Sequence, residues 1–145
     1  ARELLAAERQ RDPSDAGSRS AIAAQAALPD LDIKQEWVTR ILDTENRLPL
    51  SNLRAAMGSI FPTGQEELQL ALLPQLTSNL SELALGRDNY FQQTYGRDLF
   101  SGICEQQGLD ILSDAISDSD AIGATLYRFM SENVHSASQC LELKD

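Results

Sequence analysis

The chain has few of the residues from which catalytic and metal sites are usually built. Its 145 residues include one histidine, one tryptophan and two cysteines, and aromatic residues make up 6%. His135 has no second histidine to complete a tetrahedral zinc site, and Cys140 lies on a different face of the same expected helix. The sequence therefore predicts no catalytic, cofactor-binding or metal-ligating residue, and it predicts that His135 lies at the surface.

Motifs that hold nucleotides or position nucleophiles are also absent. The chain has no G-x-G-x-x-G or G-x-x-x-x-G-K-[ST] phosphate cradle and no G-x-S-x-G elbow that could support a triad around His135. Paired carboxylates such as Glu66 and Glu67, or Asp118 and Asp120, fall at expected helix N-termini, where the helix dipole favours negative charge. We therefore expect no enzymatic activity from this chain by itself.

Basic residues are scarce, with 12 Lys and Arg against 22 Asp and Glu, and the net charge is -10. A phosphate backbone or an anionic membrane would repel such a chain. The N-terminal segment ARELLAAERQRD has no apolar run, so it resembles neither a signal peptide nor a membrane span. We expect no nucleic-acid partner and no membrane partner, and we expect the acidic cluster at 110–120 to be solvated surface.

Two cysteines, Cys104 and Cys140, are too few for the disulfide framework of a small secreted domain. They could pair only if the helices that carry them were neighbours. We predict a reduced, cytoplasmic chain. Because the first residue is Ala1 rather than Met, we also expect the chain to be a fragment of a longer protein.

Helical periodicity is the strongest signal in the chain. Two apolar stripes follow each other across the short break at 86–88, and their members are Leu68, Leu72, Leu76, Leu80 and Leu83, then Phe91, Tyr95, Leu99 and Ile103. Steps of three and four residues keep each stripe on one face of a helix. Two such helices bury their stripes by packing together, so the segment predicts a helical hairpin with Phe91 and Tyr95 in the core.

The same periodicity predicts about eight helices and no strands. We expect them at 2–11, 13–27, 33–42, 49–60, 63–85, 88–104, 109–116 and 121–141. Thr63 and Glu66 have the spacing of a capping box, and Pro74 predicts a kink or an interruption. Trp37 should be buried with Ile33 and Ile41.

The predicted fold is all-α, a single domain over residues 1–145 with an N-terminal linking helix at 1–12. Short turns between the helices favour antiparallel neighbours stacked as hairpins, an α-solenoid of the HEAT or armadillo type. The face carrying Ala21, Ala24 and Ala27 is suited to close helix contact.

The order of these landmarks resembles one known family. The segments are DPSDAGSRSAIAAQAA, a helix with Trp37 that ends in ILD, SNLRAAMGSIF, GQEELQLALLPQL and LGRDNYFQQTYGRDLFSGIC. Together they resemble the C-terminal helical domain, of endoplasmic-reticulum-aminopeptidase type, of the aminopeptidase N family of zinc metallopeptidases. The resemblance covers residues 11–143. Its opening D-x-S-x-x-G-R-R-like pattern is matched by Asp12, Ser14, Gly17, Ser18 and Arg19.

The resemblance implies a non-catalytic domain of a bacterial-type cytosolic aminopeptidase. Such a domain would cap the active-site chamber and help to bind or size-select peptide substrates, with the catalytic domain of the same parent chain as its partner. Zinc would belong to the parent, because the H-E-x-x-H helix, the downstream glutamate ligand and the G-A-M-E-N loop are missing here. The alternative is a free-standing helical-repeat scaffold that binds a protein or peptide.

Overall fold

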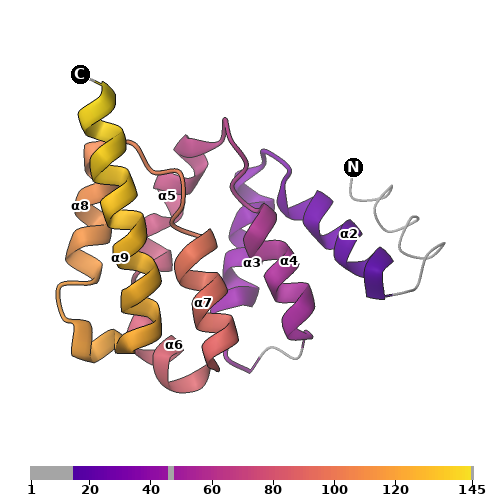
Figure 1. Cartoon of the computed structure of the whole chain (residues 1–145). Helices are drawn as coiled ribbons and strands as arrows, with labels where there is room; N and C mark the ends of the chain where they lie inside the picture. The colour runs from indigo at the N-terminus through magenta and orange to yellow at the C-terminus, as the bar shows by residue number, and fades with distance from the viewer. Residues whose placement is uncertain (1–14, 46–47, 145) are drawn as a thin grey trace.

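The computed structural model describes residues 15–45 and 48–144, and all regular structure in these ranges is α-helical (Figure 1). The helices are α2 (Asp15–Ala26), α3 (Leu31–Leu42), α4 (Leu50–Ser59), α5 (Glu66–Leu76), α6 (Leu80–Gly86), α7 (Asn89–Asp98), α8 (Gln106–Ala115) and α9 (Ser119–Lys144). The all-α prediction is therefore confirmed. The expected helix at 2–11 and the linking helix at 1–12 lie outside the described residues.

Pro74 interrupts the fifth predicted helix, as the sequence indicates. Helix α5 ends at Leu76, two residues after the proline, and α6 begins only at Leu80. Proline lacks an N–H and crowds the preceding turn, which weakens the helix there. At this end the Leu73 carbonyl accepts both the Thr77 N–H at 3.0 Å and the Thr77 hydroxyl at 2.9 Å.

Several predicted boundaries are wrong. Helix α5 begins at Glu66 with Gln65 as its N-cap, and the Glu66 carboxylate accepts a bond from the Gly64 N–H at 3.1 Å, so no capping box forms at Thr63. Helix α7 ends at Asp98, before a turn in which Gly102 has a φ of 77°. Helix α9 extends to Lys144 but is broken at Gly123, whose φ of 78° lies in the region that favours glycine.

Apart from α6, successive described helices alternate between two rows. Helices α2, α4, α7 and α9 pack in that order across the molecule, and α3, α5 and α8 form a second row behind them in Figure 1. Helix α6 packs against α9 at the lower end of the view. Helices that are distant in sequence, such as α4 and α7, therefore become neighbours.

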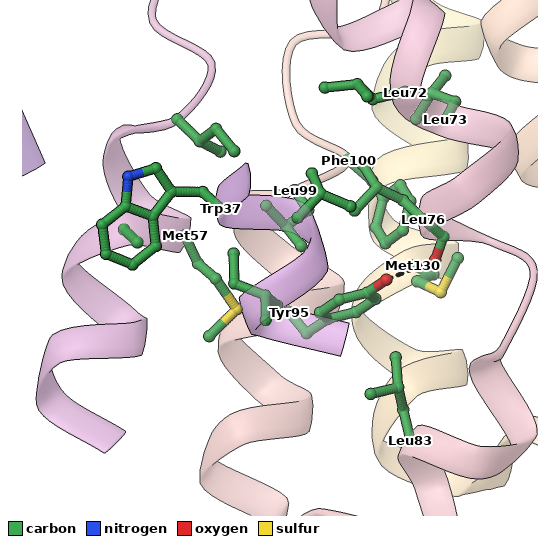
Figure 2. Close-up of a cluster of buried hydrophobic side chains, with 14 of the residues drawn as sticks. Trp37, Met57, Leu72, Leu73, Leu76, Leu83, Tyr95, Leu99, Phe100 and Met130 are labelled. Carbon is green, nitrogen blue, oxygen red and sulfur yellow. Dashed lines mark hydrogen bonds between the residues drawn. The ribbon is translucent and has the colours of Figure 1, made fainter. Parts of the chain in front are cut away.

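One apolar core lies between the rows, and it contains the residues that the periodicity predicts (Figure 2). Trp37 is 2% exposed, with Ile33 and Ile41 also buried on the same helix, which confirms the prediction for α3. The two leucine and aromatic stripes are buried apart from Leu68, which is half-buried. On α2 the predicted alanine face is wrong, because Ala24 is exposed and the buried positions are Ala21, Ile22 and Ala26.

A buried lysine joins the ends of two helices. The Lys34 side chain is fully buried, and its Nζ donates to the carbonyl of Ala26 at 2.9 Å and to the carbonyl of Ile60. These carbonyls belong to the C-terminal ends of α2 and α4. Burial lowers the pKa of Lys34 from 10.5 to about 8, and the nearby Asp30 carboxylate opposes this shift.

Other helix ends are closed by side chains in the same way. The Arg87 guanidinium donates to the carbonyl of Ile41 in the last turn of α3 and to that of its C-cap residue Asp43. The buried Tyr95 hydroxyl donates to the last carbonyl of α5, that of Leu76 (Figure 2). The Gln69 amide donates to the carbonyls of Leu99 and Ser101 beyond α7, at 3.0 and 2.9 Å. Burial also raises the pKa of Tyr95, so its hydroxyl stays protonated as a donor.

Replacing Tyr95 with phenylalanine removes the donor to Leu76 while keeping the aromatic ring in the core. We expect Tyr95→Phe to lower the free energy of unfolding by about 1–3 kcal/mol, because a buried carbonyl is left without a partner. Urea denaturation followed by circular dichroism measures this change. A loss below about 0.5 kcal/mol, the usual range for surface substitutions, would show that the bond contributes little.

Lys34 predicts a pH dependence of stability. Between its folded pKa of about 8 and the ordinary value of 10.5, the unfolded chain binds more protons than the native chain. The contribution of Lys34 to the free energy of unfolding therefore rises with pH across this window. We expect urea denaturation at pH 7.5–10 to show a more positive pH slope for the wild type than for Lys34→Met. Parallel curves would contradict the burial of a charged amine.

Candidate functional site

The residues that the sequence singles out for metal chemistry do not come together. His135 is exposed on α9, and the sulfur of Cys140 is bonded to Cys104. Over residues 15–45 and 48–144, no group of three or more His, Cys, Asp or Glu side chains could hold a metal ion. The residues that the structure describes therefore do not fit a zinc site.

The aromatic residues of α7 divide between core and surface. The rings of Phe91 and Tyr95 are buried and stack with centroids 5.8 Å apart, which confirms their predicted place in the core. Tyr90 is 66% exposed at the start of the helix. These three residues line no common groove.

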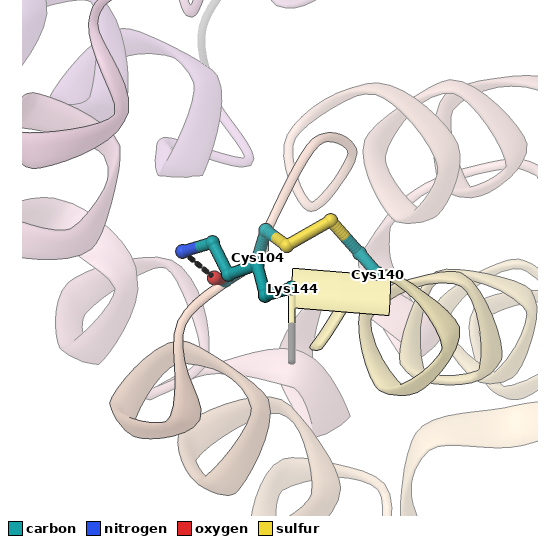
Figure 3. The surroundings of a disulfide bond; sticks show 3 residues. All are labelled: Cys104, Cys140 and Lys144. Atoms are coloured by element: carbon teal, nitrogen blue, oxygen red, sulfur yellow. Dashed lines mark hydrogen bonds between the residues drawn. A yellow bond between two sulfur atoms is a disulfide. The ribbon is translucent and has the colours of Figure 1, made fainter. Parts of the chain in front are cut away.

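The two cysteines form a disulfide, so the predicted reduced thiols are wrong. Cys104 and Cys140 are 36 residues apart, with their Cα atoms 5.5 Å from each other. The bond joins the loop between α7 and α8 to the last turns of α9, and Lys144 Nζ donates to the Cys104 carbonyl at 2.9 Å (Figure 3). Packing of α8 against α9 brings the two cysteines together. Helical periodicity does not predict which helices pack against each other, so the sequence did not indicate this contact.

A surface depression of about 550 Å³ adjoins the disulfide. Its charged lining consists of Glu66, Glu67, Glu105 and Lys144. Glu66 already accepts a bond from the Gly64 N–H, which holds the pKa of its carboxyl below the usual value. The Lys144 ammonium is likewise engaged by the Cys104 carbonyl, so two of the four charges serve the local structure.

A second groove, of about 490 Å³, lies across the first row of helices. Each of three neighbouring helices contributes one arginine and at least one hydroxyl or alanine to its lining. The lining residues are Arg19, Ser20 and Ala23 from α2, Ser51, Arg54 and Ala55 from α4, and Thr94, Arg97 and Asp98 from α7. We call this depression the arginine groove. Its described lining holds three arginines and one aspartate in a chain whose net charge is -10.

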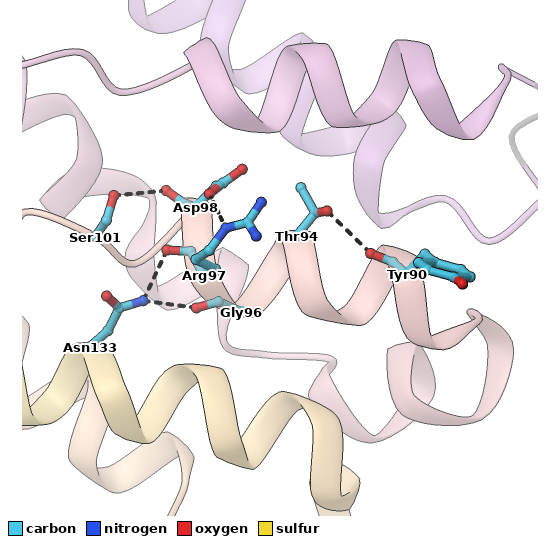
Figure 4. A network of polar contacts seen from close by, with 7 residues as sticks. All are labelled: Tyr90, Thr94, Gly96, Arg97, Asp98, Ser101 and Asn133. Carbon is cyan, nitrogen blue, oxygen red and sulfur yellow. Dashed lines mark hydrogen bonds and ion pairs between the residues drawn. The ribbon is translucent and has the colours of Figure 1, made fainter.

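One arginine of the groove is paired and two are not. Arg97 Nε donates to the Asp98 carboxylate at 2.9 Å, and this bond raises the pKa of Arg97 (Figure 4). Arg19 and Arg54 make no ion pair and no hydrogen bond with any described residue. The groove thus presents two guanidinium groups whose donors are not used by any residue in the described ranges.

Helix α7 is held firmly beneath the arginine groove. On the side of α7 away from Asp98, the Asn133 amide of α9 donates to the carbonyls of Gly96 and Arg97 at 2.9 and 3.0 Å (Figure 4). A Cβ atom on Gly96 would lie 3.1 Å from the Cβ of Phe129, so glycine permits this close approach of α9. The groove floor is therefore positioned by contacts that run through the fold.

The sequence prediction missed the arginine groove because it weighed charge over the whole chain. Helices α2, α4 and α7 carry three arginines and only two aspartates, Asp15 and Asp98. Helical periodicity places the arginines on polar faces without indicating that those faces meet. The local surplus of arginine in these three segments is the signal that could have indicated the groove.

No protein-family model matches this chain, and no curated protein matches it. The resemblance to the C-terminal domain of the aminopeptidase N family therefore stays a prediction. Among the helices that the structure describes, none is both long and apolar enough to cross a membrane.

The disulfide predicts a dependence of stability on reductant. Closing a loop of 36 residues in the unfolded chain should stabilise the fold by about 2–4 kcal/mol. We expect dithiothreitol to lower the free energy of unfolding by that amount, and to have no effect on the Cys104→Ser/Cys140→Ser variant. Thiol titration of denatured protein purified without reductant should find none. Two free thiols per chain would contradict the bond.

Proposed function

We propose that the chain is the non-catalytic C-terminal domain of a zinc-dependent aminopeptidase of the aminopeptidase N type. In this proposal its helices form an α-solenoid of antiparallel hairpins that covers the active-site chamber of the catalytic domain. The domain limits access to the chamber and helps to bind or size-select peptides. Zinc and its ligands belong to the parent, and this chain contributes no residue to the chemical step.

The observation that carries the proposal is the alternation of helices between two rows. Helices α2, α4, α7 and α9 pack side by side, while α3, α5 and α8 lie behind them. Stacked helix pairs in which each pair contacts its neighbours are the basis of solenoids, which use extended surfaces for binding. This packing supports the solenoid, and the order of sequence landmarks supports the family.

A free-standing scaffold that binds a peptide or protein is the second candidate. The arginine groove favours it, because the unpaired Arg19 and Arg54 offer donors on a surface that no described segment covers. Both candidates use the helices to hold a polypeptide. They differ in whether a catalytic domain is attached to the chain.

The disulfide indicates which kind of cellular compartment the parent protein occupies. Bonds such as Cys104–Cys140 persist mainly in oxidising environments and are rare in the cytosol. We therefore propose an oxidising compartment for the parent in place of the predicted cytoplasmic one. The thiol titration above, applied to protein taken directly from its native source, tests this part of the proposal.

Truncation of the parent enzyme tests the proposed function. We expect deletion of residues 1–145 to leave the zinc content intact. For peptides of four or more residues, the deletion should raise KM more than it lowers kcat, because an open chamber would bind the substrate and the transition state less tightly by a similar amount. A single aminoacyl-naphthylamide is the control substrate, and its KM should change less. An unchanged KM for the long peptides, measured on soluble and zinc-loaded truncated enzyme, would contradict the proposal.

A further inference from the structure

We infer that the arginine groove binds an extended acidic segment of another polypeptide, with side-chain carboxylates paired to Arg19 and Arg54. The inference holds whether the chain stands alone or belongs to a peptidase, so it does not rest on the proposed function. It depends on three properties of the groove, namely its unpaired cations, its length and its local charge.

The unpaired cations distinguish this groove from the rest of the surface. Elsewhere in the described residues, Arg40 lies 4.9 Å from the centre of the Trp37 ring, and Arg128 pairs with Glu132 at 3.9 Å. Arg87 donates to backbone carbonyls. In contrast, Arg19 and Arg54 have no partner among the described residues, and both line the same groove. Guanidinium groups match carboxylates with two parallel hydrogen bonds, so their natural ligand is a carboxylate or another oxyanion.

The length of the groove favours a peptide over a small anion. Packed helices lie about 8–10 Å apart, so a ligand that crosses α2, α4 and α7 spans about 16–20 Å. An extended chain advances about 3.3 Å per residue, which makes this span equal to about five or six residues. The arginines come from three different helices, so one segment can present more than one carboxylate to them. Hydroxyls of Ser20 and Ser51 lie along the same path and can bond to a peptide backbone.

The net charge of -10 does not prevent this binding. At physiological ionic strength the Debye length is about 8 Å, so carboxylates on distant helices are largely screened while groups inside the groove are not. Among the described residues that line the groove, the only carboxylate is that of Asp98, which is already neutralised by Arg97. The local field of the groove is therefore positive.

Fluorescence anisotropy tests the inference on the 145-residue chain. The probe is a fluorescein-labelled, C-terminally amidated hexapeptide in which three glutamates alternate with alanine, at 150 mM salt. We expect saturable binding, and we expect Arg19→Gln and Arg54→Gln each to weaken it about fivefold, the upper range for a solvent-exposed ion pair. Arg128→Gln is the matched control, because it removes an exposed arginine outside the groove and should leave the affinity unchanged. Circular dichroism verifies that each variant is folded.

Several results would overturn the inference. Equal binding of the hexapeptide with glutamine in place of glutamate would show that carboxylates are not recognised. Equal weakening by Arg128→Gln would show that binding follows overall charge. Displacement of the probe by an alanine peptide with a free C-terminus, added at the concentration of the probe, would show that the groove binds a terminal carboxylate instead. Displacement by equimolar inorganic phosphate would assign it to a small anion.

Discussion

The structure depends on the pairing of carbonyl groups at the C-terminal ends of its helices. Every α-helix leaves its last carbonyls without an intrahelical donor, and many helices solve this with a left-handed glycine directly after the end. Among the described residues only Gly64, Gly102 and Gly123 have positive φ. Gly123 lies at the break within α9, and neither Gly64 nor Gly102 immediately follows the last residue of a helix. Backbone N–H groups of the following turns satisfy some of these carbonyls, such as those of Thr39 and Leu83, and side chains of other elements supply donors to several others.

These donors also explain why the two rows form one body. Lys34 of α3 reaches the ends of α2 and α4, so a residue of the second row joins two neighbours of the first. Gln69 of α5, also in the second row, donates to two carbonyls of the segment that follows α7 and so joins that segment to α5. Each bond satisfies a buried acceptor only when both elements are in place. Loss of one donor should therefore weaken two elements together rather than fray a single helix end.

Periodicity predicted the parts of this structure that depend on apolar contact. It placed Trp37, Phe91 and Tyr95 in the core, and it located the interruption after Pro74. Helical periodicity could not predict the long-range polar partners. The hydrogen bond from Gln69 to the Ser101 carbonyl, for example, depends on how α5 packs against the end of α7. The disulfide was missed for the same reason, since the contact between α8 and α9 decides it.

The arginine groove follows from the same packing. Arg19, Arg54 and Arg97 are spread over about 80 residues of sequence and meet only because α2, α4 and α7 are consecutive members of one row. Residues such as Lys34 and Asn133 bond to the ends of these helices and help to hold them in place. Binding at the arginine groove therefore relies on hydrogen-bond donors, those of Lys34 and Asn133, that do not line the groove.

Native-state hydrogen exchange of the Gln69→Leu variant tests whether side-chain donors join the two rows of helices. The substitution keeps an apolar side chain of similar size at a position that is 3% exposed, and it removes the donor to the Leu99 and Ser101 carbonyls. We expect protection to fall in both α5 and α7, by about 1–3 kcal/mol for each carbonyl left unpaired. Protection that is unchanged in both helices, or lost only around residue 69, would contradict the claim that these bonds join the rows.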